Sequence, residues 1–214
     1  MWTLIKREIK DNIIMFLLAV ILAGICEAVV VSGFLRPYTQ YIPAGIPIVI
    51  YVILPFFIIS LCLLAVTMGG IQMYLDKRGK ISAFLSSLAV TRRGLFSAKL
   101  LAGIIWLVVA LLPLVAAELF LFRVKPRLIP ADYSFLVRIY IVTVLCALSC
   151  YLLGLNLGLW QNRIVAILGG ALLCLVLMSL IVIKGFDAEI MLIFGITSAA
   201  LAVRAWNVFM SIPL

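Results

Sequence analysis

The stretch Asp76 to Lys99, DKRGKISAFLSSLAVTRRGLFSAK, is the longest polar interruption in an otherwise apolar chain. Four apolar residues in it recur at i, i+3, i+4 and i+7, which gathers them on one face of a helix. These residues are Ile81, Phe84, Leu85 and Leu88. Gly79 breaks the apolar run before them, and Thr91, ahead of two arginines, can cap the helix that follows. The stretch therefore predicts a short amphipathic helix between two membrane spans.

Basic residues indicate the side of the membrane on which this stretch lies. Six lysines and arginines stand there against a single acid, Asp76. They are Lys77, Arg78, Lys80, Arg92, Arg93 and Lys99. Because cytoplasmic loops carry an excess of Lys and Arg, the stretch is predicted to be cytoplasmic.

The composition is typical of a polytopic membrane protein. Hydrophobic residues make up 67% of the 214 and charged residues 12%, and the mean hydropathy is +1.34, whereas soluble domains have about 25% charged residues. No polar stretch is long enough to bury a core of its own, which excludes a soluble domain. The net charge of +9 lies at the ends of apolar runs, as topology signals do, so no nucleic-acid binding is predicted.

The apolar runs predict an all-α fold of one transmembrane domain, 1–214, with six membrane-spanning helices. The spans are about 13–35, 46–73, 100–122, 139–160, 164–183 and 190–210. Residues 1–12 place Trp2, Ile5 and Ile9 on one helical face, which predicts an interfacial helix. Six spans put both termini on one side, with eleven of the lysines and arginines there and six on the other. Both termini are therefore predicted to be cytoplasmic.

The cysteines are predicted to be packing residues. All five lie inside apolar runs without CxxC spacing: Cys26, Cys62, Cys146, Cys150 and Cys174. Cys146 and Cys150 are one helical turn apart, but the chain has no histidine, so no metal site is predicted there. The same lack of histidine, and of any paired carboxylate motif, predicts no catalytic site.

Two acids lie within predicted spans, where an ionised carboxylate is costly. Glu27 is in the first span and Glu118 in the third. Each is interpreted either as part of a translocation path or subunit contact, or as a carboxylate that is protonated or paired, Glu118 with Arg123 for example. Small residues in GxxxG-like spacing, Gly154 with Gly158 and Gly195 with Ala199, predict close helix packing.

No ATP-binding motif is present in the chain. Gly79-Lys80 is its one Gly-Lys pair, but Tyr74 stands in the place of the first P-loop glycine. Ile81 stands where Ser or Thr should follow the lysine. If the protein works by ATP, another chain supplies the site.

The pattern resembles the membrane subunit of ABC-2 type transporters, mainly exporters, over nearly the whole chain. The resemblance lies in the run WTLIKREIKD from Trp2 to Asp11, the six spans, and the segment between spans two and three. In that segment the matching residues are Asp76, Gly79, Phe84-Leu85, Ser87, Val90, Arg92-Arg93 and Lys99. The chain departs from the family at Lys80-Ile81-Ser82, where Thr-Leu-Glu is frequent, and at Ala89, where proline is frequent. The connection from Lys184 to Glu189 is also too short for the family's outer re-entrant helices.

The resemblance implies a permease subunit of a bacterial or archaeal cytoplasmic membrane that dimerises with itself or a paralogue. It implies that the central segment is a coupling helix, which docks on ABC ATPase subunits through Ile81, Phe84, Leu85 and Leu88, with Arg92 and Arg93 beside them. No cofactor is expected in this chain, because ATP and magnesium would be bound by the partner. A non-transporting membrane anchor or assembly subunit is the alternative, followed by a membrane-embedded enzyme and a secondary transporter. The apolar face of the segment could also rest on the lipid surface.

Overall fold

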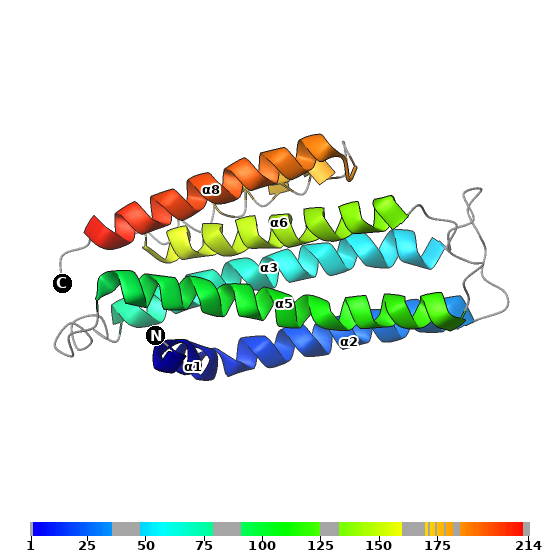
Figure 1. Cartoon of the computed structure of the whole chain (residues 1–214), viewed down its shortest axis with the longest axis horizontal. Coiled ribbons are helices and arrows are strands. Elements are labelled where there is room, and N and C mark those ends of the chain that lie inside the picture. Colours follow the sequence, from blue (N-terminus) through cyan, green and yellow to red (C-terminus); the bar gives the residue numbers. More distant parts are fainter. Residues whose placement is uncertain are drawn as a thin grey trace.

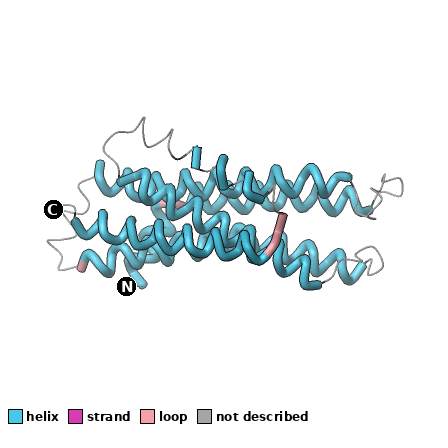
Figure 2. Tube along the Cα trace, turned by 90° about the horizontal axis from the view of Figure 1, so that it is seen from above, coloured by secondary structure: helices cyan, strands magenta, loops and turns pink. Residues whose placement is uncertain are grey.

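Long helices lying side by side make up the described part of the computed structural model (Figures 1 and 2). The structure describes residues 2–35, 48–78, 91–124, 133–159, 170, 172–173, 175–177, 179–181 and 185–211. The helices are α1 (Trp2–Asp11), α2 (Ile13–Leu35), α3 (Ile48–Arg78), α5 (Arg92–Val124), α6 (Tyr133–Leu159) and α8 (Ala188–Ser211). The all-α prediction is confirmed for these residues.

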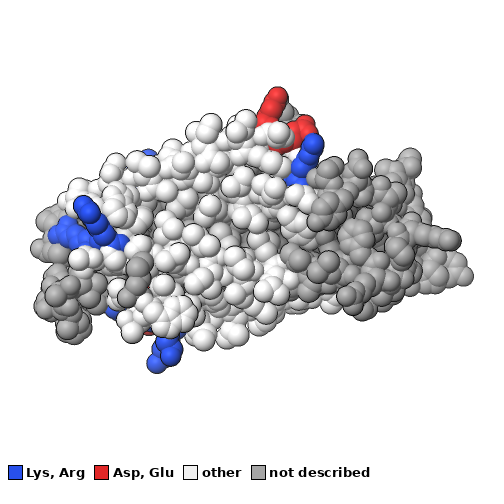
Figure 3. Space-filling view, in the orientation of Figure 1, with Lys and Arg blue, Asp and Glu red and all other residues white. Residues whose placement is uncertain are grey.

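Three stretches of these helices are long and apolar enough to cross a membrane, judged by length and composition. They are Arg92–Leu112, Val137–Leu159 and Ala188–Ser211. Two shorter apolar stretches, Ile13–Ile25 and Ile58–Tyr74, belong to α2 and α3. On the face shown in Figure 3, the described charged side chains lie away from an uncharged central region. These features are those of an integral membrane protein.

Some helix boundaries agree with the predicted spans and others extend past them. Helix α2 begins and ends at the residues predicted for the first span. Helix α5 begins at Arg92, eight positions before the predicted span, because Thr91 caps it as the sequence predicted. The Gly94 amide donates to Thr91 Oγ1 at 3.2 Å and the Leu95 amide to the Thr91 carbonyl at 3.1 Å. The predicted span covers only the apolar run, whereas the helix also includes the polar residues that precede this run.

Helices α3 and α6 pack so closely that glycine is required between them. A Cβ atom at Gly154 would collide with the backbone of Val66, and one at Gly69 would collide with the backbone of Tyr151. At Gly158 a Cβ atom would lie 2.7 Å from Met73 Cβ. The packing predicted for Gly154 and Gly158 is therefore confirmed.

The second small-residue pair, on α8, does not pack in this way. A Cβ atom at Gly195 would meet no described atom within 4 Å, and Ala199 is exposed. Helix α8 contacts α6 instead through polar groups. Ser149 and Ser198 hydroxyls lie 2.8 Å apart, and Asn156 Nδ2 donates to the Leu201 carbonyl at 3.0 Å.

Basic residues gather at one end of the bundle. Helix α1, the last residues of α3, the first residues of α5 and the last residues of α8 lie at one end in Figure 1, and Figure 2 shows both termini at that same end. The basic residues of α1 (Lys6, Arg7 and Lys10) and the first two residues of α5 are at this end. Helix α8 follows Asp187 and carries Glu189 in its first turn, close in sequence to the positive-φ residue Gly185.

The interfacial face predicted for α1 is only partly in contact with the bundle. Ile5 is buried as part of the core, but Trp2 is 71% exposed. The residues that α1 presents to the protein are Ile5 and Glu8, with Asn12 buried just after the helix. A charged residue, Glu8, therefore faces inward.

Candidate functional site

A buried ion pair joins the N-terminal helix to α5. Lys99 Nζ lies 3.0 Å from Glu8 Oε1, and the side chains are 1% and 6% exposed. The two residues are 91 positions apart in the sequence. A buried charge without a partner is strongly destabilising, so each side chain requires the other.

Two further buried residues extend this pair to α3 and α6. Lys99 Nζ also donates to the Gln72 carbonyl at 3.3 Å. The Tyr151 hydroxyl lies 2.7 Å from Gln72 Oε1 and 2.8 Å from the Lys99 carbonyl oxygen. We call Glu8, Gln72, Lys99 and Tyr151 the buried polar cluster; it connects α1, α3, α5 and α6.

The hydroxyl of Tyr151 cannot donate to both of its neighbours at once, since it carries a single proton. Gln72 Nε2 is buried and has no hydrogen-bond partner in the orientation shown. Both observations are resolved if the amide presents Nε2 to the Tyr151 oxygen while the Tyr151 proton goes to the Lys99 carbonyl. The Tyr151 ring fits between the helices because residue 103 is glycine: a Cβ atom there would collide with the ring.

The first turns of α5 make further contacts with α2 and α8. Trp106 Nε1 donates to the Met15 carbonyl on α2 at 3.1 Å. Arg92 Nη1 donates to the Met210 carbonyl near the end of α8 at 3.0 Å. Phe96 packs edge-on against Trp206 with ring centroids 5.3 Å apart. Over its first four turns, α5 is thus held to helices α1, α2, α3, α6 and α8.

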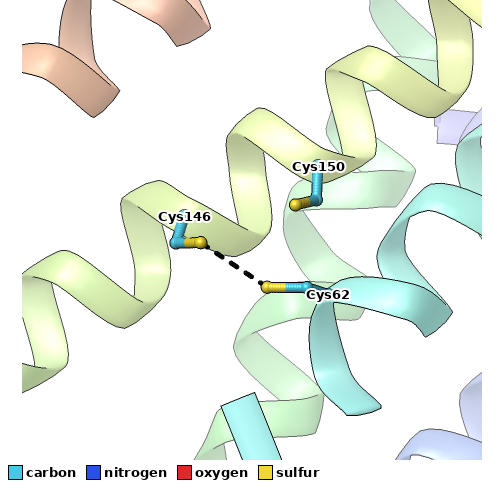
Figure 4. A group of neighbouring side chains, drawn as sticks. All are labelled: Cys62, Cys146 and Cys150. Carbon is cyan, nitrogen blue, oxygen red and sulfur yellow. Dashed lines mark hydrogen bonds between the residues drawn. The ribbon is translucent and has the colours of Figure 1, made fainter. Parts of the chain in front are cut away.

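A second buried cluster consists of three thiols. Cys62 of α3 faces Cys146 and Cys150 of α6, and the three sulfur atoms lie within 4.8 Å of one another (Figure 4). Cys62 Sγ is 3.6 Å from Cys146 Sγ, and all three cysteines are buried and form no disulfide. We call this group the cysteine triad; among the described residues it is the one gathering of Cys, Asp and Glu side chains found able to hold a metal ion.

Most of the site residues predicted from the sequence lie outside the described residues. This applies to Ile81, Phe84, Leu85 and Leu88. Glu27 and Glu118 are on α2 and α5, but their side chains are also outside the described set. Of the predicted pair at the start of α5, Arg92 is half-buried against α8 and Arg93 is exposed.

Sequence reasoning missed the buried polar cluster. Lys99 was predicted as part of a cytoplasmic loop, but it lies on α5 and is buried. Lys99 can be buried because Glu8 supplies the opposite charge. Glu8 belongs to a helix that was predicted to lie on the membrane surface. Gln72 near the end of an apolar run was the one local signal for the cluster.

The buried polar cluster links α1, α3, α5 and α6 through an ion pair and hydrogen bonds. Its carboxylate is paired with the Lys99 ammonium group, and its Tyr151 hydroxyl lies within hydrogen-bond distance of Gln72 Oε1 and the Lys99 carbonyl oxygen. A scan of protein-family models, a search of curated proteins and a search of solved structures each found no match. Functional inference therefore depends on the geometry of these two clusters and on the sequence pattern.

Proposed function

We propose that this chain is the membrane-spanning permease subunit of an ATP-driven ABC exporter, with six spans and both termini in the cytoplasm. In this proposal ATP and magnesium bind a separate ATPase, and residues 81–88 form the coupling helix between the second and third spans. The observation that carries the proposal is the buried Glu8–Lys99 ion pair, which ties α1 to the start of α5.

The position of the pair supports a mechanical role. The central segment joins the end of α3 to the start of α5, and each of these ends carries one member of the buried polar cluster, Gln72 and Lys99. A force applied to that segment reaches both helices. Through Glu8 and Tyr151 it also reaches α1 and α6.

The low exposure of the cluster makes this linkage stiff. Separating Lys99 from Glu8 would leave two uncompensated charges in the interior, so the joined helix ends move together. Closure of two ATPase subunits would then shift the bundle between two states as a rigid-body change. The exposed basic side chain of Arg93 lies beside the segment, where it can meet an acidic group of the partner.

The outer faces of the bundle fit a lipid bilayer and a second permease chain. Large apolar side chains on α2 and α8 are exposed, including Ile14, Leu17, Leu192 and Ile196. Such faces are stable only when lipid or another apolar surface covers them.

A non-transporting membrane anchor is the second candidate. One observation favours it: Lys99, Tyr151 and Ser149 are buried and bonded to protein groups instead of facing a path for substrate. An anchor would need the same spans and the same buried polar cluster. It would not need an ATPase.

Purification of the tagged protein in mild detergent from its own membrane tests the proposal. We expect a P-loop ATPase to be recovered in stoichiometric amount with the wild type. The double variant Phe84→Asp/Leu85→Asp should lose it, since charge on the apolar face prevents docking. The matched control is the exchange Phe84→Leu/Leu85→Phe, which keeps the apolar character and should retain the ATPase. Equal recovery with the Asp variant would refute docking, and no ATPase with the wild type would favour the anchor.

A further inference from the structure

We propose that the cysteine triad is a binding site for monovalent copper between α3 and α6. The triad supplies three soft sulfur donors from two helices, as Figure 4 shows. The proposal is independent of the ABC exporter function and would hold for an anchor as well.

The spacing of the sulfur atoms fits a three-coordinate ion. A metal–sulfur bond of about 2.3 Å places three sulfurs about 4.0 Å apart around a trigonal centre. The observed separations include 3.6 Å between Cys62 and Cys146 and do not exceed 4.8 Å for any pair. Shifts of less than about 1 Å, within the reach of a thiol rotamer change, therefore bring all three sulfurs to one ion.

The backbone holds these donors in place before any ion binds. Cys146 and Cys150 are four residues apart on α6, which puts both on one face of the helix. Cys62 approaches them because α3 and α6 are in close contact, as the glycine contacts at Gly69 and Gly154 show. A site that is already assembled loses little conformational entropy on binding.

The chemistry of the donors selects the ion. Thiols are soft ligands that favour Cu(I) and Zn(II) over hard ions such as Mg²⁺ and Ca²⁺. Structural zinc sites are almost always four-coordinate. The group found among the described Cys, Asp and Glu side chains contains three donors, and the chain has no histidine. Three sulfur donors suit Cu(I), which accepts trigonal coordination.

Binding of the ion changes the protonation of the site. The thiolate is the form of cysteine that ligates a metal, so coordination of one Cu⁺ by all three sulfurs releases three protons to solvent and leaves a net charge of −2. All three cysteines are at most 2% exposed, so this charge is costly. Copper affinity at the triad should therefore rise with pH.

The first test is a titration of the full-length protein in detergent, reduced and free of oxygen, with Cu(I) in competition with a chromophoric Cu(I) chelator. We expect one Cu(I) per chain, and X-ray absorption should show three sulfur neighbours at about 2.3 Å. Absence of bound copper in the wild type, or copper held by two sulfurs only, would overturn the proposal without any variant. Formation of a Cys62–Cys146 disulfide in place of copper binding, detected by mass spectrometry, would overturn it too.

Variants then assign the ligands. Cys62→Ser should weaken Cu(I) binding by more than about 100-fold, because loss of an outer-shell group alone costs 10–100-fold. The matched control Cys26→Ser/Cys174→Ser removes the other two thiols and should bind as the wild type does. Cys62→Ala serves as a second variant, and gel filtration and tryptophan fluorescence report whether each protein is folded. Wild-type affinity in a folded Cys62 variant, or loss of binding in the control, would refute the assignment.

Discussion

Replacement of Lys99 by methionine should destabilise the bundle strongly. Methionine keeps the length of the side chain but removes the ammonium group, which leaves the Glu8 carboxylate buried without its cation. The Nζ–Oε1 distance is 3.0 Å and the two side chains are 1% and 6% exposed, so water screens the pair very little. Breaking a buried pair by removing one partner costs about 3–5 kcal/mol. We expect a loss in this range from Lys99→Met, and a similar loss from Glu8→Gln.

The double variant separates the pair from the individual side chains. Replacing both members of a buried ion pair by apolar residues is often neutral or stabilising. Glu8→Met/Lys99→Met should therefore regain most of the stability lost by Lys99→Met. With each of the single variants Glu8→Met and Lys99→Met costing about 3–5 kcal/mol, the coupling energy from the double-mutant cycle should be at least about 4 kcal/mol in magnitude, above the usual range of about 0.5–3 kcal/mol for residues in contact.

Unfolding in mixed detergent micelles with increasing sodium dodecyl sulfate, followed by tryptophan fluorescence, measures these free energies. The matched control is the pair Arg7–Asp11 on the same helix α1, with N and O atoms 3.4 Å apart and side chains 34% and 49% exposed. Asp11→Asn should cost at most about 0.5 kcal/mol. The reasoning is wrong if Lys99→Met costs no more than this control, or if the double variant is as unstable as the sum of the single ones.

Further predictions concern packing, capping and the tyrosine. Gly154→Ala should lower the free energy of unfolding by about 1–3 kcal/mol through overpacking. Gly195→Ala, where a Cβ atom has open space, should not lower it. Equal effects of the two variants in the same detergent titration would contradict the glycine packing. Thr91→Ala should cost about 1 kcal/mol of stability by removing the cap of α5, and Thr91→Ser should cost less. Hydrogen exchange of the first α5 amides measures the loss. Unchanged exchange in the alanine variant would argue against the cap. Tyr151→Phe leaves two buried groups without their hydroxyl partner and should cost about 1–3 kcal/mol. Wild-type stability of that variant, measured by thermal unfolding, would show that Gln72 finds another partner.

The sequence was most informative where the signal is local. The apolar run of 23 residues at 13–35 predicted the bounds of α2, and Thr91 predicted the cap of α5. The spacing of Gly154 and Gly158 predicted close packing. Each of these signals depends on neighbours within a few residues. The predicted spans are shorter than helices such as α5, because the end of an apolar run does not stop a helix that polar residues can continue.

The contents of the bundle interior depend on partners that are distant in the sequence. Lys99 looks like a topology signal unless Glu8 is known to lie beside it. A count of basic residues does not distinguish a buried, paired lysine from one exposed at the membrane surface. In the sequence, Cys62 is one of several cysteines inside apolar runs. Its position next to Cys146 becomes evident only from the way α3 approaches α6. Hydrophobic periodicity reports which face of a helix is buried, but it does not identify the helix that covers that face.

The 91-residue separation of Glu8 and Lys99 has a consequence for how the protein is made. At about 5–20 residues per second, Lys99 leaves the ribosome some 5–18 s after Glu8. During that interval the carboxylate has no cation to meet, and a hydrated position at the membrane surface is the stable one for it. The ion pair that holds α1 against α5 can therefore form only after Lys99 has been synthesised, so the N-terminal helix must wait for the first turns of α5 before it can bury its carboxylate.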